Sequence, residues 1–125
     1  MLLRISGRGI LTALNQMLES HPIPSGSYPH LSQEFRLQFD STTPSAKSKV
    51  ISLTHRGQPI DLDRIYKLSC TTFMATGGDG ITGFPTYGTI ISKDSWKVGD
   101  LVLAYLRKHQ LYQPHIIPRV FCSEQ

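Results

Sequence analysis

The residues of this 125-residue chain whose types and spacing could bind a small molecule are Phe73 and Asp79. They lie six residues apart in the sequence Phe-Met-Ala-Thr-Gly-Gly-Asp-Gly, at residues 73–80. An aromatic ring can stack on a nucleic-acid base, and a carboxylate can accept hydrogen bonds from neighbouring hydroxyls, such as the 2′ and 3′ hydroxyls of a ribose. Glycines let a ligand approach the backbone closely. Together these residues indicate a nucleoside site.

A glycine-rich stretch can also bind phosphate, through backbone N–H groups. Asp79 argues against an anion here, since two like charges 4 Å apart repel by roughly 4 kcal/mol at an effective dielectric constant of about 20. The sequence therefore favours the ribose over the phosphate, and it predicts a positive φ at Gly77 or Gly78. On local pattern alone, Phe73 as an ordinary core residue and Asp79 as an ordinary turn residue stay open.

The elements that must position this stretch follow from the apolar pattern. Alternation of side chains predicts a strand over residues 65–73, with Tyr66, Leu68 and Cys70 on a buried face and Phe73 on the polar face near its end. The other predicted strands cover residues 35–39, 50–55 and 116–121, the last at a sheet edge because it contains Pro118.

Two stripes of apolar residues predict amphipathic helices. The first runs from Ile10 to Leu18, capped by Ser6 and ended by the His-Pro pair at residues 21–22. The second, capped by Asp94 or Ser95, has the stripe Val98, Leu101, Val102, Tyr105 and Leu106. The pattern indicates an α+β fold, with a mixed sheet of about four strands flanked by two long helices. Residues 22–29, rich in proline and glycine, are predicted to be a connecting loop.

The stretch 66–80 resembles the C-terminal domain of the 5′-nucleotidase family, whose members include UDP-sugar hydrolases and cyclic-nucleotide phosphodiesterases. Gly-Gln-Pro-Ile-Asp at residues 57–61 resembles the turn before the family's strand, and residues 104–106 and 119–120 also fit. The resemblance runs over nearly the whole chain. It implies a layered helix-sheet-sheet-helix fold, with residues 1–125 forming one partial domain of this type.

The same resemblance implies roles for individual residues. Phe73 would form one half of a sandwich around the base, and Asp79 would hold the ribose hydroxyls, in a substrate-binding loop that includes Gly77 and Gly78. The family's second stacking aromatic and its phosphate-contacting arginines lie upstream of the point where Met1 falls. Its catalytic residues and two divalent metals belong to an N-terminal metallophosphoesterase domain. No catalytic residue, metal site or cofactor is therefore expected in this chain.

Composition excludes some classes of partner. The chain has 13 Lys and Arg against 9 Asp and Glu, and no run of five like charges, so no nucleic-acid partner is expected. It has no run of 18 apolar residues, so no membrane partner is expected. Cys70 and Cys122 leave a disulfide and the redox compartment open, and no signal assigns a cellular location.

The first functional hypothesis is a domain that binds the nucleotide or nucleoside substrate for a metallophosphoesterase domain, supplied in cis or in trans. On this hypothesis the chain alone binds ligand and does not catalyse. The alternative is a remnant or interaction domain that keeps the fold without binding a ligand. An open cleft beside Phe73 and Asp79 would favour the first hypothesis, and a filled one would favour the second.

Overall fold

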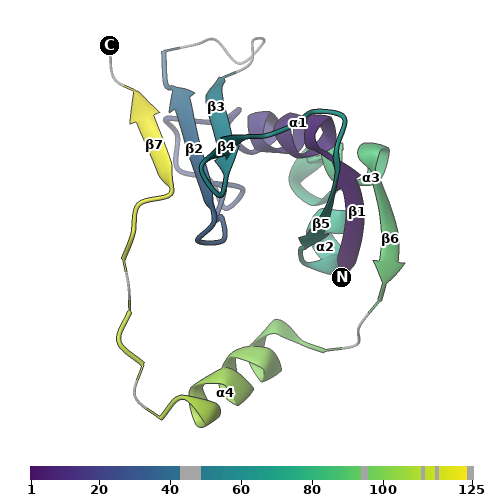
Figure 1. Cartoon of the computed structure of the whole chain (residues 1–125), viewed down its shortest axis with the longest axis vertical. Helices are drawn as coiled ribbons and strands as arrows, with labels where there is room; N and C mark the ends of the chain where they lie inside the picture. The colour runs from purple at the N-terminus through teal and green to yellow at the C-terminus, as the bar shows by residue number, and fades with distance from the viewer. Residues whose placement is uncertain (43–48, 94–95, 111, 115, 124–125) are drawn as a thin grey trace.

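The computed structural model describes residues 1–42, 49–93, 96–110, 112–114 and 116–123 (Figure 1). Within them the strands form a three-stranded sheet in the order β5-β1-β6 and a four-stranded sheet in the order β4-β3-β2-β7. Helix α1 lies between the two sheets.

The three-stranded sheet is antiparallel throughout. Strand β1 (Leu2–Ser6) is its centre and pairs with β5 (Ile65–Ser69) on one side and β6 (Gly88–Ser92) on the other. Leu3 and Ile5 point from β1 into the core and are almost completely buried. The apolar pattern predicted β5 but neither β1 nor β6, whereas the family resemblance implied two sheet layers, as the structure has.

The four-stranded sheet is mixed, as predicted. Strand β2 (Phe35–Asp40) pairs antiparallel with β3 (Val50–His55) and parallel with β7 (Val120–Ser123), and β3 also pairs with the short β4 (Gln58–Pro59). The predicted α+β class is confirmed. Strand β7 lies at an edge of the sheet, as predicted, but it begins at Val120, after the proline that cannot donate to the ladder.

Helix α1 (Gly7–Met17) matches its prediction. Ser6 is the N-cap residue, and its Oγ accepts a hydrogen bond from the Gly9 amide at 3.2 Å. The helix buries its apolar stripe between the sheets, and its Asn15 Oδ1 accepts a hydrogen bond from the Val50 amide at 3.1 Å. This bond ties the helix to the start of β3.

Three short helical segments follow β5: α2 (Thr72–Ala75), the 3-10 turn η1 (Gly78–Gly80) and α3 (Gly83–Tyr87). The predicted strand over residues 65–73 is therefore wrong in its last part. The chain leaves the strand after Ser69 because Thr71 caps α2: its Oγ1 accepts a hydrogen bond from the Met74 amide at 3.2 Å.

The second predicted helix is α4 (Val98–Lys108), which the structure places apart from both sheets (Figure 1). The predicted caps, Asp94 and Ser95, lie outside the described residues, and Lys97 stands at the N-cap position. The helix does not flank a sheet, because no other described element packs extensively against it. About half of the surface of each apolar residue in its stripe is exposed. No helix among the described residues is long and apolar enough to span a bilayer.

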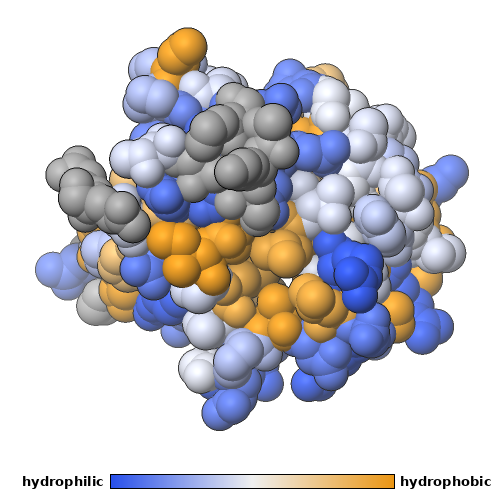
Figure 2. All heavy atoms as spheres, turned by 90° about the horizontal axis from the view of Figure 1, so that it is seen from above, coloured by the Kyte–Doolittle hydropathy of each residue, from blue (hydrophilic) through white to orange (hydrophobic). Residues whose placement is uncertain are grey.

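Part of the molecular surface is apolar. Figure 2 shows apolar side chains gathered in the middle of the face seen from above, with hydrophilic residues around them. Exposed large apolar residues occur on the strands as well as on α4, among them Ile51, Ile65 and Ile91. Large exposed apolar patches on a folded domain are typical of surfaces that another polypeptide covers.

An ion pair closes the turn between β3 and β4. Arg56 (φ 53°) and Gly57 (φ 77°) form this turn, and the Arg56 guanidinium donates two hydrogen bonds, of 2.7 and 3.0 Å, to Glu34 Oε1. His55 Nε2 lies 3.3 Å from Glu34 Oε2. The bonds from Arg56, and then the one from His55, hold the pKa of Glu34 below its ordinary value.

We expect Glu34→Gln to destabilise the protein at pH 7 and to have little effect in acid. Because folding lowers this pKa, the carboxylate contributes stability above its unfolded pKa, and the contribution is lost as the pH falls through the folded pKa. Urea unfolding at pH 7 and pH 3 measures the difference. Asp63→Asn, which changes an exposed carboxylate 3.4 Å from Arg8, is the control and should show a smaller difference. An equal loss at both pH values in Glu34→Gln would contradict this account.

Candidate functional site

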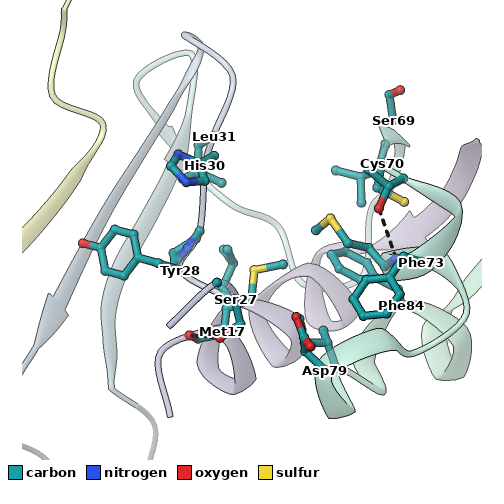
Figure 3. A pocket seen from close by; sticks show the side chains of 17 residues that line it. Met17, Ser27, Tyr28, His30, Leu31, Ser69, Cys70, Phe73, Asp79 and Phe84 are labelled. Atoms are coloured by element: carbon teal, nitrogen blue, oxygen red, sulfur yellow. Dashed lines mark hydrogen bonds between the residues drawn. The ribbon is translucent and has the colours of Figure 1, made fainter. Parts of the chain in front are cut away.

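A cavity of about 330 Å³ opens beside the glycine-rich stretch (Figure 3). One wall is the loop of residues 26–31, and the other is formed by the end of β5, α2, η1 and α3. Met17 and Leu14 of α1 lie between the two walls. Both Phe73 and Asp79 line this cavity, so the structure brings together the two residues that the sequence singled out.

Phe73 lies on α2 and not on the strand, yet its side chain is 57% exposed. Its ring packs against Gly78 of the following turn. On the same side of the cavity, the ring of Phe84 is buried. Phe73 is therefore not an ordinary core residue, because it offers an aromatic surface to the cavity.

The turn that carries Asp79 has a strained backbone. Gly77 (φ 89°), Asp79 (φ 56°) and Gly80 (φ 75°) all have positive φ, whereas Gly78 does not. The predicted positive φ is thus confirmed at Gly77. A non-glycine residue rarely adopts the left-handed region, although Asp tolerates it better than most. Such outliers are concentrated at functional sites, where the surrounding structure maintains them.

The Asp79 carboxylate is available to a ligand. Its side chain is exposed and lies at the cavity (Figure 3). Among the residues that the structure describes, none forms a hydrogen bond or an ion pair with this carboxylate. Its oxygens are therefore free to accept hydrogen bonds from a bound molecule.

Sequence reasoning missed the opposite wall. Figure 3 shows Tyr28 and His30 across the cavity from Phe73. The Tyr28 ring packs against His21 and Phe39, at centroid distances of 6.3 and 6.5 Å, and burial raises the pKa of its hydroxyl. The loop looked like a connector because of its prolines and glycines. The signal that could have found this wall is the sequence Tyr-Pro-His inside the loop, where an aromatic and an imidazole flank a proline.

Cys70 lines the cavity where β5 leads into α2. Burial raises the pKa of its thiol, an effect that the nearby N-terminal ammonium partly offsets. Cys70 and Cys122 are both free thiols, so the disulfide left open by the sequence is not formed. The Cys70 side chain thus adds a weakly polar surface to the cavity.

Potential metal ligands are scattered in the described part of the chain. There, no group of three His, Cys, Asp or Glu side chains is arranged to hold a metal ion. The divalent metals that the family resemblance associates with a metallophosphoesterase domain have no ligand set among these residues.

Comparison with protein-family models identifies the chain. The model described as "5′-nucleotidase, C-terminal domain" matches residues 1–86 of the 125, which include the whole stretch from Phe73 to Gly80. The chain belongs to this family. The resemblance noted at residues 104–106 and 119–120 falls beyond the matched residues.

Solved structures of other proteins resemble the fold of nearly the whole chain, including the residues beyond 86. A 5′-nucleotidase precursor of Thermus thermophilus is similar over 99% of this chain, with a TM-score of 0.86 and 21% identity. The NAD nucleotidase of Haemophilus influenzae is similar over 98%, with a TM-score of 0.74 and 18% identity. A sulfate thiohydrolase of Thermus thermophilus shares the fold over 99%, with a TM-score of 0.67 and 16% identity.

These relatives are much longer than the chain. It covers 25%, 24% and 22% of the three proteins respectively, so it spans about a quarter of their length. No curated protein matches the sequence significantly. The comparisons therefore establish the family and the fold of a C-terminal domain.

Proposed function

We propose that the cavity binds the nucleoside part of a nucleotide, and that the chain is the substrate-binding domain of a 5′-nucleotidase-type hydrolase. The observation that carries this proposal is that the Phe73 ring and the Asp79 carboxylate, from one short stretch, face the same cavity. The Phe73 ring stacks on the base, and the Asp79 carboxylate accepts hydrogen bonds from the 2′ and 3′ hydroxyls. Gly77 gives the turn its left-handed bend.

The shape of the site supports this assignment. The cavity volume of about 330 Å³ lies at the lower end of the range for small-molecule sites. Apolar residues of α1, α2 and α3 surround the base position, and Asp79 is the acidic residue among the lining residues. A mostly apolar pocket with few polar groups is the usual arrangement for a ligand that combines a flat ring with a sugar.

Hydrolysis is assigned to another domain. The chain supplies binding, and a metallophosphoesterase domain, in cis or in trans, supplies the metals and cleaves the phosphate ester. The fourfold greater length of the T. thermophilus nucleotidase relative supports a second domain, as do the exposed apolar residues of α4 and the strands. The sulfate thiohydrolase relative shows that the fold alone does not determine the substrate, so the test must examine the ligand directly.

Matched ligands separate the two proposed contacts. We expect adenosine to bind with a dissociation constant no tighter than about 1 mM, which corresponds to roughly −4 kcal/mol. Phe73→Ala should weaken adenosine and 2′,3′-dideoxyadenosine alike, by roughly 1–3 kcal/mol, because both present the same base. Asp79→Asn should weaken adenosine more than the dideoxy compound, because only adenosine has the diol. NMR titration of the labelled chain measures both affinities.

Asp100→Asn, on the distant helix α4, is the control and should leave both affinities unchanged. Equal losses for the two ligands in Asp79→Asn would remove the ribose role. If adenosine caused no shifts near residues 73–80 in the parent chain, the remnant-domain alternative would replace this proposal.

A further inference from the structure

Gly78 differs from the other glycines of the turn. Gly77 and Gly80 have positive φ, a backbone conformation that glycine adopts more easily than other residues. The φ of Gly78 is not in this region, so its backbone conformation does not require glycine. What excludes a side chain at Gly78 is the Phe73 ring. A Cβ built there would lie under 3.0 Å from three ring atoms of Phe73, Cδ1, Cε1 and Cζ.

The geometry of this contact shows which part of the ring is involved. The three ring atoms are adjacent and almost equally distant from the Cβ position. If the Cβ position lay in the plane of the ring and outside its edge, it would be clearly nearer to Cε1, the middle of the three atoms, than to Cδ1 and Cζ. The Cβ position therefore lies over the face of the ring, and the ring rests with one face on Gly78. Phe73 is nevertheless 57% exposed, so the contact with Gly78 leaves much of its surface open.

We propose that Gly78 is a positioning residue that holds the Phe73 ring flat against the turn. This inference rests on the nucleoside-binding function proposed above and deepens it. Because Asp79 follows Gly78 directly in the chain, resting the ring on Gly78 fixes the stacking face relative to the ribose acceptor. The spacing between these two groups then selects ligands that carry a base and a sugar diol at the separation of an intact nucleoside, over a free base or a free sugar.

A role in positioning differs from a role in stability. The atoms nearest to a Cβ at Gly78 are all in the Phe73 side chain, which is exposed and can rotate away. Alanine at Gly78 should therefore displace the ring with little effect on folding. Alanine at Gly77 or Gly80 keeps space for the Cβ but must adopt positive φ, so its effect should fall on stability.

The test compares Gly78→Ala with Gly80→Ala as the matched control. We expect Gly78→Ala to keep the melting temperature of the parent and to weaken adenosine at least about fivefold, like Phe73→Ala. Gly80→Ala should melt at a lower temperature and retain the contact between residues 73 and 78. The double variant Phe73→Ala/Gly78→Ala should bind no more weakly than Phe73→Ala alone, because the second change acts only through the ring.

A readout without ligand keeps this inference separate from the proposed function. In the parent chain, the Phe73 ring should shift the Gly78 Hα resonances upfield and show NOEs to them, and Phe73→Ala should abolish both signals. Absence of these signals in the parent, or parent-like adenosine affinity in Gly78→Ala, would overturn the positioning role. If the signals are present and adenosine does not bind, Gly78 still positions the ring, and the nucleoside function fails.

Discussion

Replacing Phe39 with alanine should lower the free energy of unfolding by about 3–5 kcal/mol. Phe39 on β2 is completely buried, and its ring contacts that of His21 edge-on at a centroid distance of 4.9 Å. Its removal leaves a cavity in the core between the four-stranded sheet and α1. Because the ring also supports Tyr28, the loop that forms one wall of the candidate site should lose order at the same time.

Urea unfolding measures the stability loss, and the NMR linewidths of Tyr28 and His30 report on the wall. Phe121→Ala is the matched control. It removes the same side chain from the neighbouring strand β7, where Phe121 is 43% exposed, and should cost much less. Similar losses for the two variants, or an unchanged Tyr28 environment in Phe39→Ala, would show that the core is not centred where the structure places it.

Gly83→Ala should have the second-largest effect on stability. Overpacking should lower its free energy of unfolding by about 1–3 kcal/mol. Gly83 begins α3 at its contact with α1. A Cβ there would lie 2.6 Å from the Ala13 backbone nitrogen and 2.9 Å from its Cα. These are helix backbone atoms that cannot rotate away, so α3 itself must move. The change should also strain the hydrogen bond of 2.9 Å from the Gly83 amide to Gln16 Oε1.

Gly99→Ala provides the opposite case. No atom of the described residues lies within 4 Å of a Cβ at Gly99, and in helix α4 alanine is favoured over glycine by roughly 1 kcal/mol. Thermal unfolding should therefore show a lower melting temperature for Gly83→Ala and an equal or higher one for Gly99→Ala. A parent-like melting temperature in Gly83→Ala would mean that α1 and α3 are not packed through this glycine.

Sequence patterns predicted the elements whose signals are local. Strands β2 and β3 show clear alternation, and α1 has an apolar stripe, a capping serine and a proline beyond its end, so these three were located to within a few residues. Strand β1 was missed because Leu2–Ser6 is short and its partners β5 and β6 are remote in sequence. The pairing of such strands depends on contacts between residues far apart in the sequence, which the local pattern of apolar residues does not show.

The residues of the candidate site were singled out by the same kind of local signal. Phe73 and Asp79 were found because they are six residues apart, although the alternation wrongly extended the strand through the Thr71 cap. The wall containing Tyr28 was missed because only the tertiary fold brings that loop to the cavity. For α4, periodicity predicted the helix, but the residues of one helix do not specify what packs against it.

The segment around α4 can change in length more easily than the rest of the chain. The segment that joins β6 to β7 through α4 must return β7 to β2, yet α4 itself packs extensively against no other described element. Doubling the length of a flexible connection costs only about 0.6 kcal/mol in loop-closure entropy. Insertions and deletions in this segment therefore need no compensating change in the core. We expect length variation among homologues to be concentrated in the connections from β6 to α4 and from α4 to β7, which also makes these connections suitable places to graft a foreign domain.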